Sequence, residues 1–361
     1  MDPHSLSVVI AGGGTAGHIE PALAVAEVLR DRYGARITAL GTSKGLEKDI
    51  IPARGFDLEL VTPVPIPRKV TKEAFKLPFT IAKSVRETRK VLKEARADAV
   101  FGTGGYVSAS AYLAAKTLGI PTYIVETNAL AGMANKLGVK LGGTGFNAHP
   151  DSGMPGEVVG IPVRPGMGED PDGSATQRAL ERWSLSESRK TIVVTGGSQG
   201  AVSINKAVAG AVPRLTEKYQ ILHAYGKKNS APQPHENYTA VPYIDDMAAA
   251  LAAADLMVCR SGAMTVAEVT AAGVPALYVP LPHGNGEQAL NSKGVVAAGA
   301  ARQIPDEELN ADRLVREVER ILGDQPTFAA MRQAAADNEA GDAASVLAER
   351  IVSGVQQGTE Q

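Results

Sequence analysis

The chain has 361 residues, of which 44% are hydrophobic and 21% charged, and its formal net charge is −2. This length suits two domains, and the balanced charge argues against a nucleic-acid-binding protein, which would carry a basic domain. The single cysteine, Cys259, excludes an intrachain disulfide and a cysteine metal cluster, as expected in a reducing cytoplasm. Because no apolar run reaches the roughly 18 residues of a membrane span and no secretory signal opens the chain, we expect neither secretion nor membrane insertion.

The first predicted element is a buried strand at 7–11. Glycines with the spacing G-x-G-x-x-G follow it from Gly12 to Gly17, and an apolar helix pattern covers 21–30. Such a turn lets a phosphate approach backbone amides at a helix N-terminus. A dinucleotide site also needs an acidic residue after the second strand, where Gly41, Thr42 and Ser43 stand instead. NAD is therefore disfavoured, and a turn that only packs the helix on the strand is the alternative.

Strands and helices alternate along the rest of the chain. We expect strands at 36–40, 99–101, 122–125, 220–223, 256–259 and 276–279, helices at 107–118 and 263–272, and a strand, glycine turn and helix over 191–208. This alternation predicts βαβ units and parallel sheets. Segments 98–125 and 255–279 repeat one order of elements, so we expect an α/β protein of two Rossmann-like domains facing each other across a cleft.

The two domains are expected at 1–163, on the acceptor and membrane side, and at 164–339, on the nucleotide side. A linker at 162–165 leads into a predicted surface loop at 166–176. A last helix at 340–355 is expected to pack back on the first domain.

The second domain offers the better phosphate site. Gly196 to Gly200 precede one predicted helix, and Arg260 to Thr265 open another. Glu268 lies one turn into that helix, where its carboxylate can meet a ribose diol while the amides above it hold a diphosphate. The alternative is a solvated acid that complements the helix dipole.

Eight motifs resemble the MurG family, in family order from about residue 7 to 292: "GGGTAGHIEPALAVAE", "GTGGYVSASAYLAA", "ETNALAGMANK", "GIPVR", "GGSQGA", "CRSGAMTVAE", "AAGVPALYVPLPH" and "EQALN". These bacterial enzymes act in peptidoglycan synthesis, where they transfer N-acetylglucosamine from UDP-GlcNAc to undecaprenyl-diphosphate-MurNAc-pentapeptide and so convert lipid I to lipid II. The resemblance implies a GT-B fold, an inverting mechanism, and no cofactor or required metal.

The resemblance also implies the donor-binding residues. They are Thr15, Ala16, Gly17, Asn128, Arg164, Ser198, Ile244, Ala263, Met264, Thr265, Val266, Ala267, Glu268 and Gln288. Three positions depart from the family: Ala16 replaces a glycine, Glu287 replaces the first of two glutamines, and Val125 to Asn128 read Val-Glu-Thr-Asn instead of His-Glu-Gln-Asn.

Inverting transfer needs a base for the acceptor hydroxyl. His18, after the first glycine turn, is the first candidate and Glu126 the second; alternatively, His18 only orients the turn. Tyr106 matches a position on the acceptor side, although a packed tyrosine is an equal alternative. Cys259 ends an apolar strand and is expected to be a buried structural thiol.

No credible metal site is present in the sequence. Asp170 and Asp172 form a nominal Asp-x-Asp motif, but it lies in the linker with no strand before it, so we take it as coincidental. The six histidines show no metal-binding spacing. Helix dipoles, with Arg164, are then expected to stabilise the leaving diphosphate.

A basic stretch at 68–96 is the candidate membrane surface. Ten basic and three acidic residues give it a local charge of +7, and Phe75, Leu77, Phe79 and Ile81 interrupt it. Each basic residue near an anionic leaflet contributes about 1 kcal/mol. We expect a peripheral protein on the cytoplasmic face of the membrane, with UDP-GlcNAc, lipid I and the anionic inner leaflet as partners. An amphipathic core helix with a solvated basic face is the alternative.

Two rival classes remain. A nicotinamide or flavin enzyme would explain the first glycine turn but not the missing acid. A UDP-GlcNAc epimerase, or a silent nucleotide-sugar-binding protein, would share the two domains without needing the basic stretch at 68–96.

Overall fold

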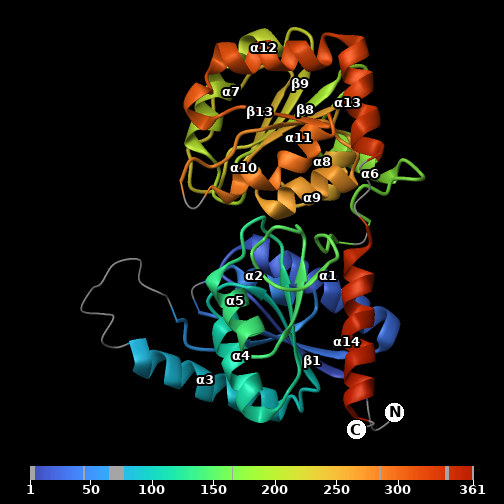
Figure 1. The fold of residues 1–361 in the computed structure, drawn as a ribbon. Helices are drawn as coiled ribbons and strands as arrows, with labels where there is room; N and C mark the ends of the chain where they lie inside the picture. Colours follow the sequence, from blue (N-terminus) through green and yellow to red (C-terminus); the bar gives the residue numbers. More distant parts are fainter. Residues whose placement is uncertain are drawn as a thin grey trace. The chain divides into compact units, whose positions relative to one another are not determined.

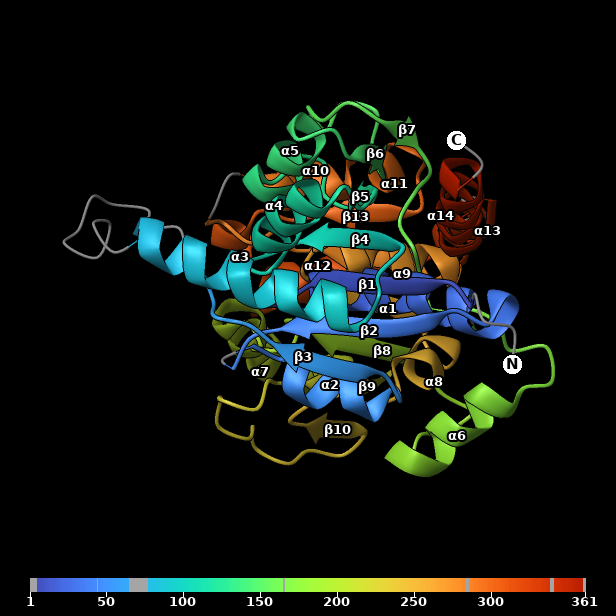
Figure 2. The same cartoon turned by 90° about the horizontal axis from the view of Figure 1, so that it is seen from below.

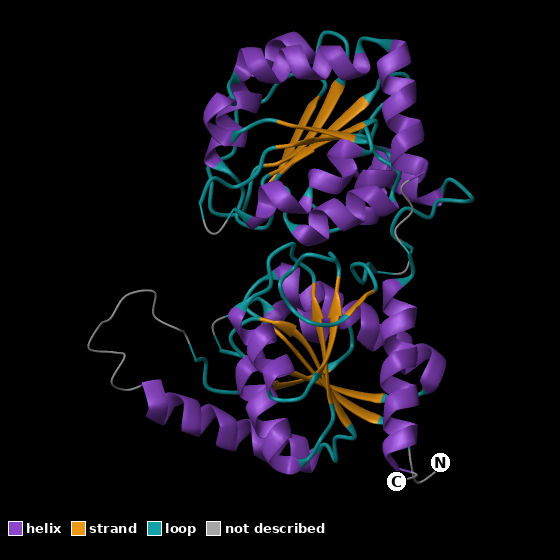
Figure 3. Cartoon of the chain, in the orientation of Figure 1, coloured by secondary structure: helices purple, strands orange, loops and turns teal. Residues whose placement is uncertain are grey.

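The computed structural model describes residues 5–43, 45–64, 77–164, 166–283, 286–337 and 341–359. The chain divides into two compact units. Unit 1 consists of Met1–Arg164 and Gly341–Gln361, and unit 2 of Pro165–Ala340. In each unit a parallel sheet lies among helices (Figures 1 and 3).

Unit 1 holds a seven-stranded parallel sheet in the order β3-β2-β1-β4-β5-β6-β7, which Figure 2 shows from bottom to top. Its strands are β1 (Ser7–Gly12), β2 (Arg36–Gly41), β3 (Asp57–Leu60), β4 (Ala99–Gly104), β5 (Thr122–Glu126), β6 (Thr144–Asn147) and β7 (Glu157–Val158). The chain starts at β1, winds outward to β3, and then returns to β4 on the other side of β1. This reversal places the ligand-binding crevice of such folds at the carboxyl ends of β1 and β4.

Helices cover both faces of this sheet (Figure 1). One face carries α1 (Ala16–Tyr33), α2 (Glu47–Ala53) and α14 (Ala343–Thr359), and the other carries α3 (Leu77–Glu94), α4 (Ser108–Leu118) and α5 (Met133–Lys140). Leu347 and Ile351 of α14 are fully buried in the same hydrophobic cluster as Leu23 and Leu29 of α1. The last helix of the chain thus contributes to the core of the first unit.

Unit 2 holds a six-stranded parallel sheet in the order β10-β9-β8-β11-β12-β13. Its strands are β8 (Thr191–Thr195), β9 (Gln220–Ala224), β10 (Tyr238–Val241), β11 (Leu256–Cys259), β12 (Ala276–Tyr278) and β13 (Ala301–Gln303). Here the chain reverses between β8 and β11, so the crevice is expected where the turns after these two strands lie.

The helices of unit 2 are α6 (Ser174–Trp183), α7 (Val202–Leu215), α8 (Met247–Ala252), α9 (Ala263–Ala271), α10 (Glu287–Asn291), α11 (Lys293–Ala297), the 3₁₀ helix η2 (Asp306–Glu308), α12 (Ala311–Leu322) and α13 (Gln325–Asp337). Apolar side chains of α7, α12 and α13 share one buried cluster with strands β8, β9, β11 and β12. This packing fixes the strand ends from which the glycine turns emerge.

The structure departs from the prediction at α1, which begins earlier, and at α6, for which no helix is predicted. Helix α1 starts at Ala16, five residues early, because the N–H groups of His18 and Ile19 already donate to the Thr15 carbonyl. Pro21 is accepted inside the helix, where it only removes one backbone donor near the start. Helix α6 starts at Ser174, inside the predicted loop. The sequence also missed the edge strands β3, β7, β10 and β13, which have only two to four residues.

His223 is a buried titratable group in the core of unit 2. Its Nδ1 lies 2.7 Å from the Tyr238 hydroxyl and its Nε2 lies 3.1 Å from Asn205 Oδ1. A neutral ring satisfies both contacts, because the hydroxyl can donate to Nδ1 while Nε2–H donates to the amide oxygen. Burial lowers the pKa of His223 from 6.5 to about 4.

This depressed pKa predicts an acid-labile fold. As the pH falls below 6.5 the unfolded chain binds a proton at His223, whereas the folded chain resists it until about pH 4. The free energy of unfolding should therefore fall by about 3 kcal/mol between these limits. Urea unfolding from pH 4 to 8 measures this fall in the free energy of unfolding, and His223→Gln should make the fall smaller. If the variant lost as much free energy of unfolding at acid pH as the unchanged chain, other groups would cause the acid lability.

Candidate active site

Two glycine turns of unit 1 meet at the carboxyl ends of β1 and β4. The N–H of Gly13 lies 3.4 Å from the Gly104 carbonyl oxygen. Gly104 and Gly105 have φ values of +103° and +90°, which favour glycine, and a Cβ on Gly105 would overlap the Gly13 carbonyl. The turns therefore form one surface whose backbones touch directly.

His18 is held on this surface by a reciprocal pair of hydrogen bonds. Its Nδ1 lies 3.0 Å from the Thr103 carbonyl oxygen, and Thr103 Oγ1 donates to the His18 carbonyl at 2.6 Å. Since a carbonyl can only accept, Nδ1 carries a hydrogen, and in the neutral ring Nε2 then keeps the lone pair. This tautomer is the one that a base at Nε2 requires.

Three predicted donor residues directly precede His18. Thr15 is the N-cap residue of α1, with an exposed side chain that makes no capping bond, and Ala16 and Gly17 are the first two residues of the helix. Tyr106 is 53% exposed, and its ring lies 3.7 Å from the position that a Cβ on Gly14 would take. The structure therefore brings Tyr106 of the second turn beside the first turn, which carries Thr15 to His18.

Glu126 is buried and engaged in four hydrogen bonds. Its Oε1 accepts from the backbone N–H and the side-chain amide of Asn128 at 2.9 and 3.2 Å. Its Oε2 accepts from the Gly132 N–H and the Asn135 amide, both at 2.9 Å. These bonds shape the loop between β5 and α5 and orient Asn128. Such a set of partners favours an orienting role over proton transfer.

Arg164, the last residue of unit 1 before the division, lies against α1. Its Nε is 3.5 Å from Glu20 Oε2, and the same carboxylate oxygen is 3.3 Å from Arg54. Glu20 thus fixes the position of the Arg164 side chain.

Sequence reasoning missed Glu47, the first residue of α2. This residue is completely buried, and its Oε1 accepts a hydrogen bond of 2.7 Å from the N–H of Gly14. The first glycine turn therefore holds a carboxylate of the protein itself. The only signal in the sequence is an acidic residue at the start of the helix after the second strand.

The first turn of unit 2 contains Ser198 and connects β8 to α7. Gly197 and Gly200 have φ values of +85° and +73°, and a Cβ on Gly200 would overlap the Tyr225 carbonyl. The Gly197 N–H donates to Thr195 Oγ1 at 3.1 Å. The turn is thus tight and closely packed on the end of β9, and it presents Ser198 half-buried.

Helix α9 presents the predicted stretch from Ala263 to Glu268. Four of these side chains, Ala263, Met264, Val266 and Ala267, are at most 8% exposed and belong to the interior. Thr265 and Glu268, three residues apart on one face, are half-buried. A ligand at this helix would contact the four buried residues through their backbone atoms only.

Arg260 connects several loops of unit 2 through hydrogen bonds. It was not predicted as a site residue. Its Nη1 donates to the carbonyls of Val279 and Pro280, both at 3.1 Å, and to Asp306 at 2.5 Å, while Nη2 donates to Ser203 Oγ at 3.0 Å. Burial raises the pKa of Asp306, but hydrogen bonds from Ser203 and Arg260 outweigh it and hold that pKa below its ordinary value. The guanidinium thereby ties together the segments that follow β8, β11 and β12.

The remaining predicted donor residues are Ile244, in the segment before α8, and Gln288, in α10. Ile244 is buried in the segment between β10 and α8. Gln288 Oε1 accepts from the Leu281 N–H at 3.0 Å, and Asn291 donates to the Ser261 carbonyl at 3.2 Å. Asn291 therefore connects α10 to the turn that opens α9.

The nominal Asp-x-Asp motif caps a helix. Asp170 accepts from the N–H groups of Ala175 and Thr176 at 2.8 and 3.0 Å, and Asp172 accepts from that of Ser174 at 3.0 Å. These bonds start α6 at Ser174. No group of three His, Cys, Asp or Glu side chains that could hold a metal occurs within the described ranges.

Cys259 is buried at the end of β11, as predicted. Burial raises the pKa of its thiol well above the ordinary value, which disfavours the reactive thiolate.

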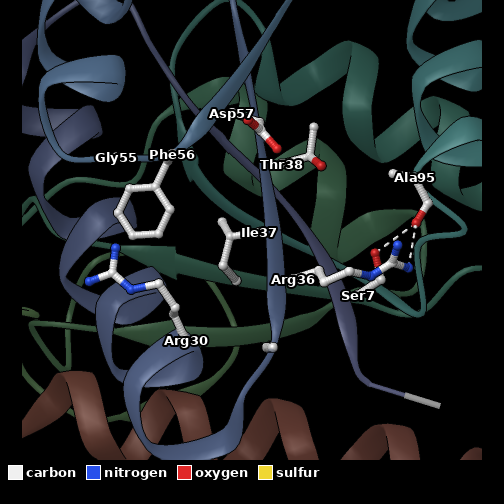
Figure 4. A pocket seen from close by; sticks show the side chains of 10 residues that line it. Ser7, Arg30, Arg36, Ile37, Thr38, Gly55, Phe56, Asp57 and Ala95 are labelled. Atoms are coloured by element: carbon white, nitrogen blue, oxygen red, sulfur yellow. Dashed lines mark hydrogen bonds between the residues drawn. The ribbon is translucent and has the colours of Figure 1, made fainter. Parts of the chain in front are cut away.

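A cavity of about 300 Å³ lies at the opposite edge of the first sheet (Figure 4). Ser7, Arg36 and Asp57, the first residues of β1, β2 and β3, line it, and the Arg30 guanidinium lies over the Phe56 ring at 4.6 Å. Because it lies at the amino ends of the strands, it contains none of the predicted site residues.

The chain is similar to known glycosyltransferases over most of its length. The glycosyltransferase family 28 N-terminal domain matches residues 8–142 and the corresponding C-terminal domain matches residues 191–347. A protein of Corynebacterium efficiens named UDP-N-acetylglucosamine--N-acetylmuramyl-(pentapeptide) pyrophosphoryl-undecaprenol N-acetylglucosamine transferase is 60% identical over 95% of this chain and 96% of its own length. A protein of that name from Corynebacterium glutamicum (strain R) is 59% identical over 96% of this chain and 98% of its own.

Solved structures agree with this similarity. The crystal structure of Acinetobacter baumannii MurG matches with a TM-score of 0.73 and 28% identity, covering 96% of this chain and 99% of that one. The calicheamicin glycosyltransferase CalG4, at 18% identity and a TM-score of 0.68 over 99% of this chain and 100% of its own, shares the fold.

The bonds of Glu126 predict a stability effect. Glu126→Ala would remove the acceptor of Asn128, Gly132 and Asn135, of which Asn135 is buried, so the free energy of unfolding should fall by about 1–3 kcal/mol. Urea denaturation measures it, with Glu59→Ala on the exposed face of β3 as the control. A Glu126→Ala protein of unchanged stability but lost activity would instead support a catalytic role.

Proposed function

The chain belongs to the MurG family within glycosyltransferase family 28, and from this premise we propose that it transfers N-acetylglucosamine from UDP-GlcNAc to undecaprenyl-diphosphate-MurNAc-pentapeptide. This reaction converts lipid I to lipid II in peptidoglycan synthesis. The observation that carries the proposal is the similarity to the corynebacterial transferases, which extends over nearly all of both chains. The predicted fold class, GT-B with two parallel-sheet α/β units, is confirmed.

Unit 2 is the proposed site of the nucleotide. The N-termini of α7 and α9 expose backbone amides and the positive ends of two helix dipoles, which suit a diphosphate. Glu268, one turn into α9, is the proposed acceptor of hydrogen bonds from a ribose diol. Arg260 supports this proposed site because it donates hydrogen bonds to Ser203 and to the carbonyls of Val279 and Pro280, which hold the turns in place.

Unit 1 is the proposed site of the proton transfer. His18 Nε2 takes the proton of the acceptor hydroxyl while that oxygen forms a bond to the anomeric carbon of N-acetylglucosamine. The bond from this carbon to the diphosphate oxygen breaks on the opposite face, UDP leaves with the electron pair, and the configuration inverts. The Thr103 contacts support this role because they fix the ring and its tautomer.

We also propose that the transfer needs neither a metal nor another cofactor. Asp170 and Asp172, which resemble a metal-binding motif in sequence, are occupied in capping α6. Helix N-termini with Arg164 are the proposed source of positive potential for the leaving UDP.

The membrane partner is proposed for helix α3 of unit 1. The part of the predicted stretch at 68–76, with Phe75, lies outside the described residues. In α3, Phe79 is 79% exposed, and Leu77, Ile81 and Val85 line an apolar groove of about 540 Å³ beside α4. Basic residues follow at Lys83, Arg86, Arg89, Lys90, Lys93 and Arg96.

This arrangement of apolar and basic side chains suits shallow insertion beside anionic headgroups. No described helix has both the length and the apolar character needed to span a bilayer. From the exposed apolar and basic side chains of α3, we propose peripheral binding at the cytoplasmic face.

Substitutions in the two units should separate chemistry from donor binding. His18→Ala should lower kcat by about 10²-fold or more with UDP affinity nearly unchanged, because it removes the base.

Glu268→Ala should weaken UDP binding by about 1.5–3 kcal/mol, the range for a charged hydrogen bond. Steady-state kinetics and calorimetry in EDTA measure both effects.

Each of these variants serves as the control for the other. Full activity of His18→Ala would leave His18 an orienting role, and unchanged UDP affinity of Glu268→Ala would leave that carboxylate a helix-dipole role. Loss of UDP binding in EDTA, with recovery in Mg²⁺, would contradict the metal-free proposal.

Charge reversal on α3 should release the protein from membranes. The double variant Arg86→Glu with Lys93→Glu should bind anionic vesicles much less and transfer more slowly to a long-chain lipid acceptor, because electrostatic attraction to the leaflet is lost. Vesicle co-sedimentation and transfer to a soluble short-chain acceptor test this, and the short-chain rate should be preserved. The matched control reverses Arg316 and Arg332 of unit 2. Equal losses with both acceptors would show that α3 serves the fold instead.

A further inference from the structure

The carboxylate of Glu47 occupies a slot that three glycines leave open. A Cβ on Gly13 or Gly45 would overlap the carboxylate, and a Cβ on Gly41 would lie only 2.9 Å from the Glu47 Cβ. These glycines come from the turn after β1, the end of β2 and the segment before α2. Residues from three parts of unit 1 thus make room for one acidic side chain.

The contacts inside the slot are unusual for a buried acid. Oε1 accepts the 2.7 Å hydrogen bond from the Gly14 N–H, while Oε2 is buried and has no hydrogen-bond partner among the described residues. A buried carboxylate with so few partners is expensive in free energy, so tight packing alone does not account for an acid here.

The Gly14 N–H belongs to the glycine turn at the N-terminus of α1, the position at which nucleotide-binding folds hold a phosphate. We propose that Glu47 is a specificity-determining residue. Its carboxylate occupies the position at which this turn would bind an anion, and it thereby prevents a phosphate from binding there. The negative charge repels a second anion, and the hydrogen bond to Gly14 removes the donor that a phosphate would use.

One consequence deepens the proposed function and rests on it. The turn that carries Thr15 to His18 would then meet neutral groups of the substrates, such as sugar hydroxyls. The diphosphate of UDP-GlcNAc would be left to unit 2, where the turns are bordered by the guanidinium of Arg260.

The test measures binding of inorganic pyrophosphate to the full chain with the UDP site saturated by UDP. Glu47→Ala and Gly45→Ala should each lower the Kd for pyrophosphate by about tenfold or more, since either change frees the Gly14 N–H. Gly45→Ala leaves Glu47 in the chain but fills its slot, and the φ of Gly45 lies outside the left-handed region. Glu47→Gln, which keeps the volume and loses the charge, should lower the Kd by less.

Matched controls are Glu59→Ala, an exposed acid of unit 1, and Gly358→Ala, a glycine of α14 with open space around its Cβ position. Both should bind pyrophosphate as the unchanged chain does, and melting temperatures identify any variant that does not fold. Unchanged Kd values in folded Gly45→Ala and Glu47→Gln, or equal gains in the controls, would overturn the assignment. Absence of transferase activity in the unchanged chain would refute the proposed function. The difference in the Kd for pyrophosphate between these variants and the controls would still test the role of Glu47.

Discussion

The backbone contact between the turn at Gly13 and the turn at Gly104 and Gly105 is the constraint on which the rest of unit 1 depends. Only residues without a Cβ allow this approach, and the approach brings the carboxyl ends of β1 and β4 together. The carbonyl of Thr103, one residue earlier, then meets the ring of His18. The tautomer and position of the proposed base are thus consequences of backbone geometry that no single side chain could supply.

Unit 2 repeats this architecture, but its largely buried charged groups form an ion pair between Arg260 and Asp306. Its turn after β8 also depends on a glycine contact, between Gly200 and the Tyr225 carbonyl. The group that ties its loops together is the guanidinium of Arg260, whereas a carboxylate, Glu47, occupies the turn of unit 1. In the proposed function the diphosphate of the nucleotide sugar is bound at the turns of unit 2, whereas the carboxylate of Glu47 disfavours a phosphate at the first turn of unit 1.

The central strands and glycine turns were predictable because their signals are local: buried strands such as β1 and β8 are short apolar runs, and the glycines follow them directly. The bonds of Glu47 and Glu126 were not, since each depends on contacts made only in the folded chain. Glu47 accepts a hydrogen bond from Gly14, 33 residues earlier, and α1 and β2 lie between them in the chain. The start of α1 was missed because Pro21 is normally a helix-start signal, and here it lies inside the first turns.

The proposed division of the two substrates between the units agrees with the proposed membrane surface on α3. Helix α3 packs on α4, and Ser84 donates to Ser110 between them, so α3 is fixed to the layer that carries the turn of Gly104 and Gly105. A lipid-linked acceptor held near α3 would thus be bound by the same unit that carries His18. The nucleotide sugar, which is soluble, needs no such surface, and unit 2 can bind it through turns and helix N-termini alone. Because the whole chain has a net charge of only −2 and α3 is basic, the proposed attraction to the leaflet would be confined to unit 1.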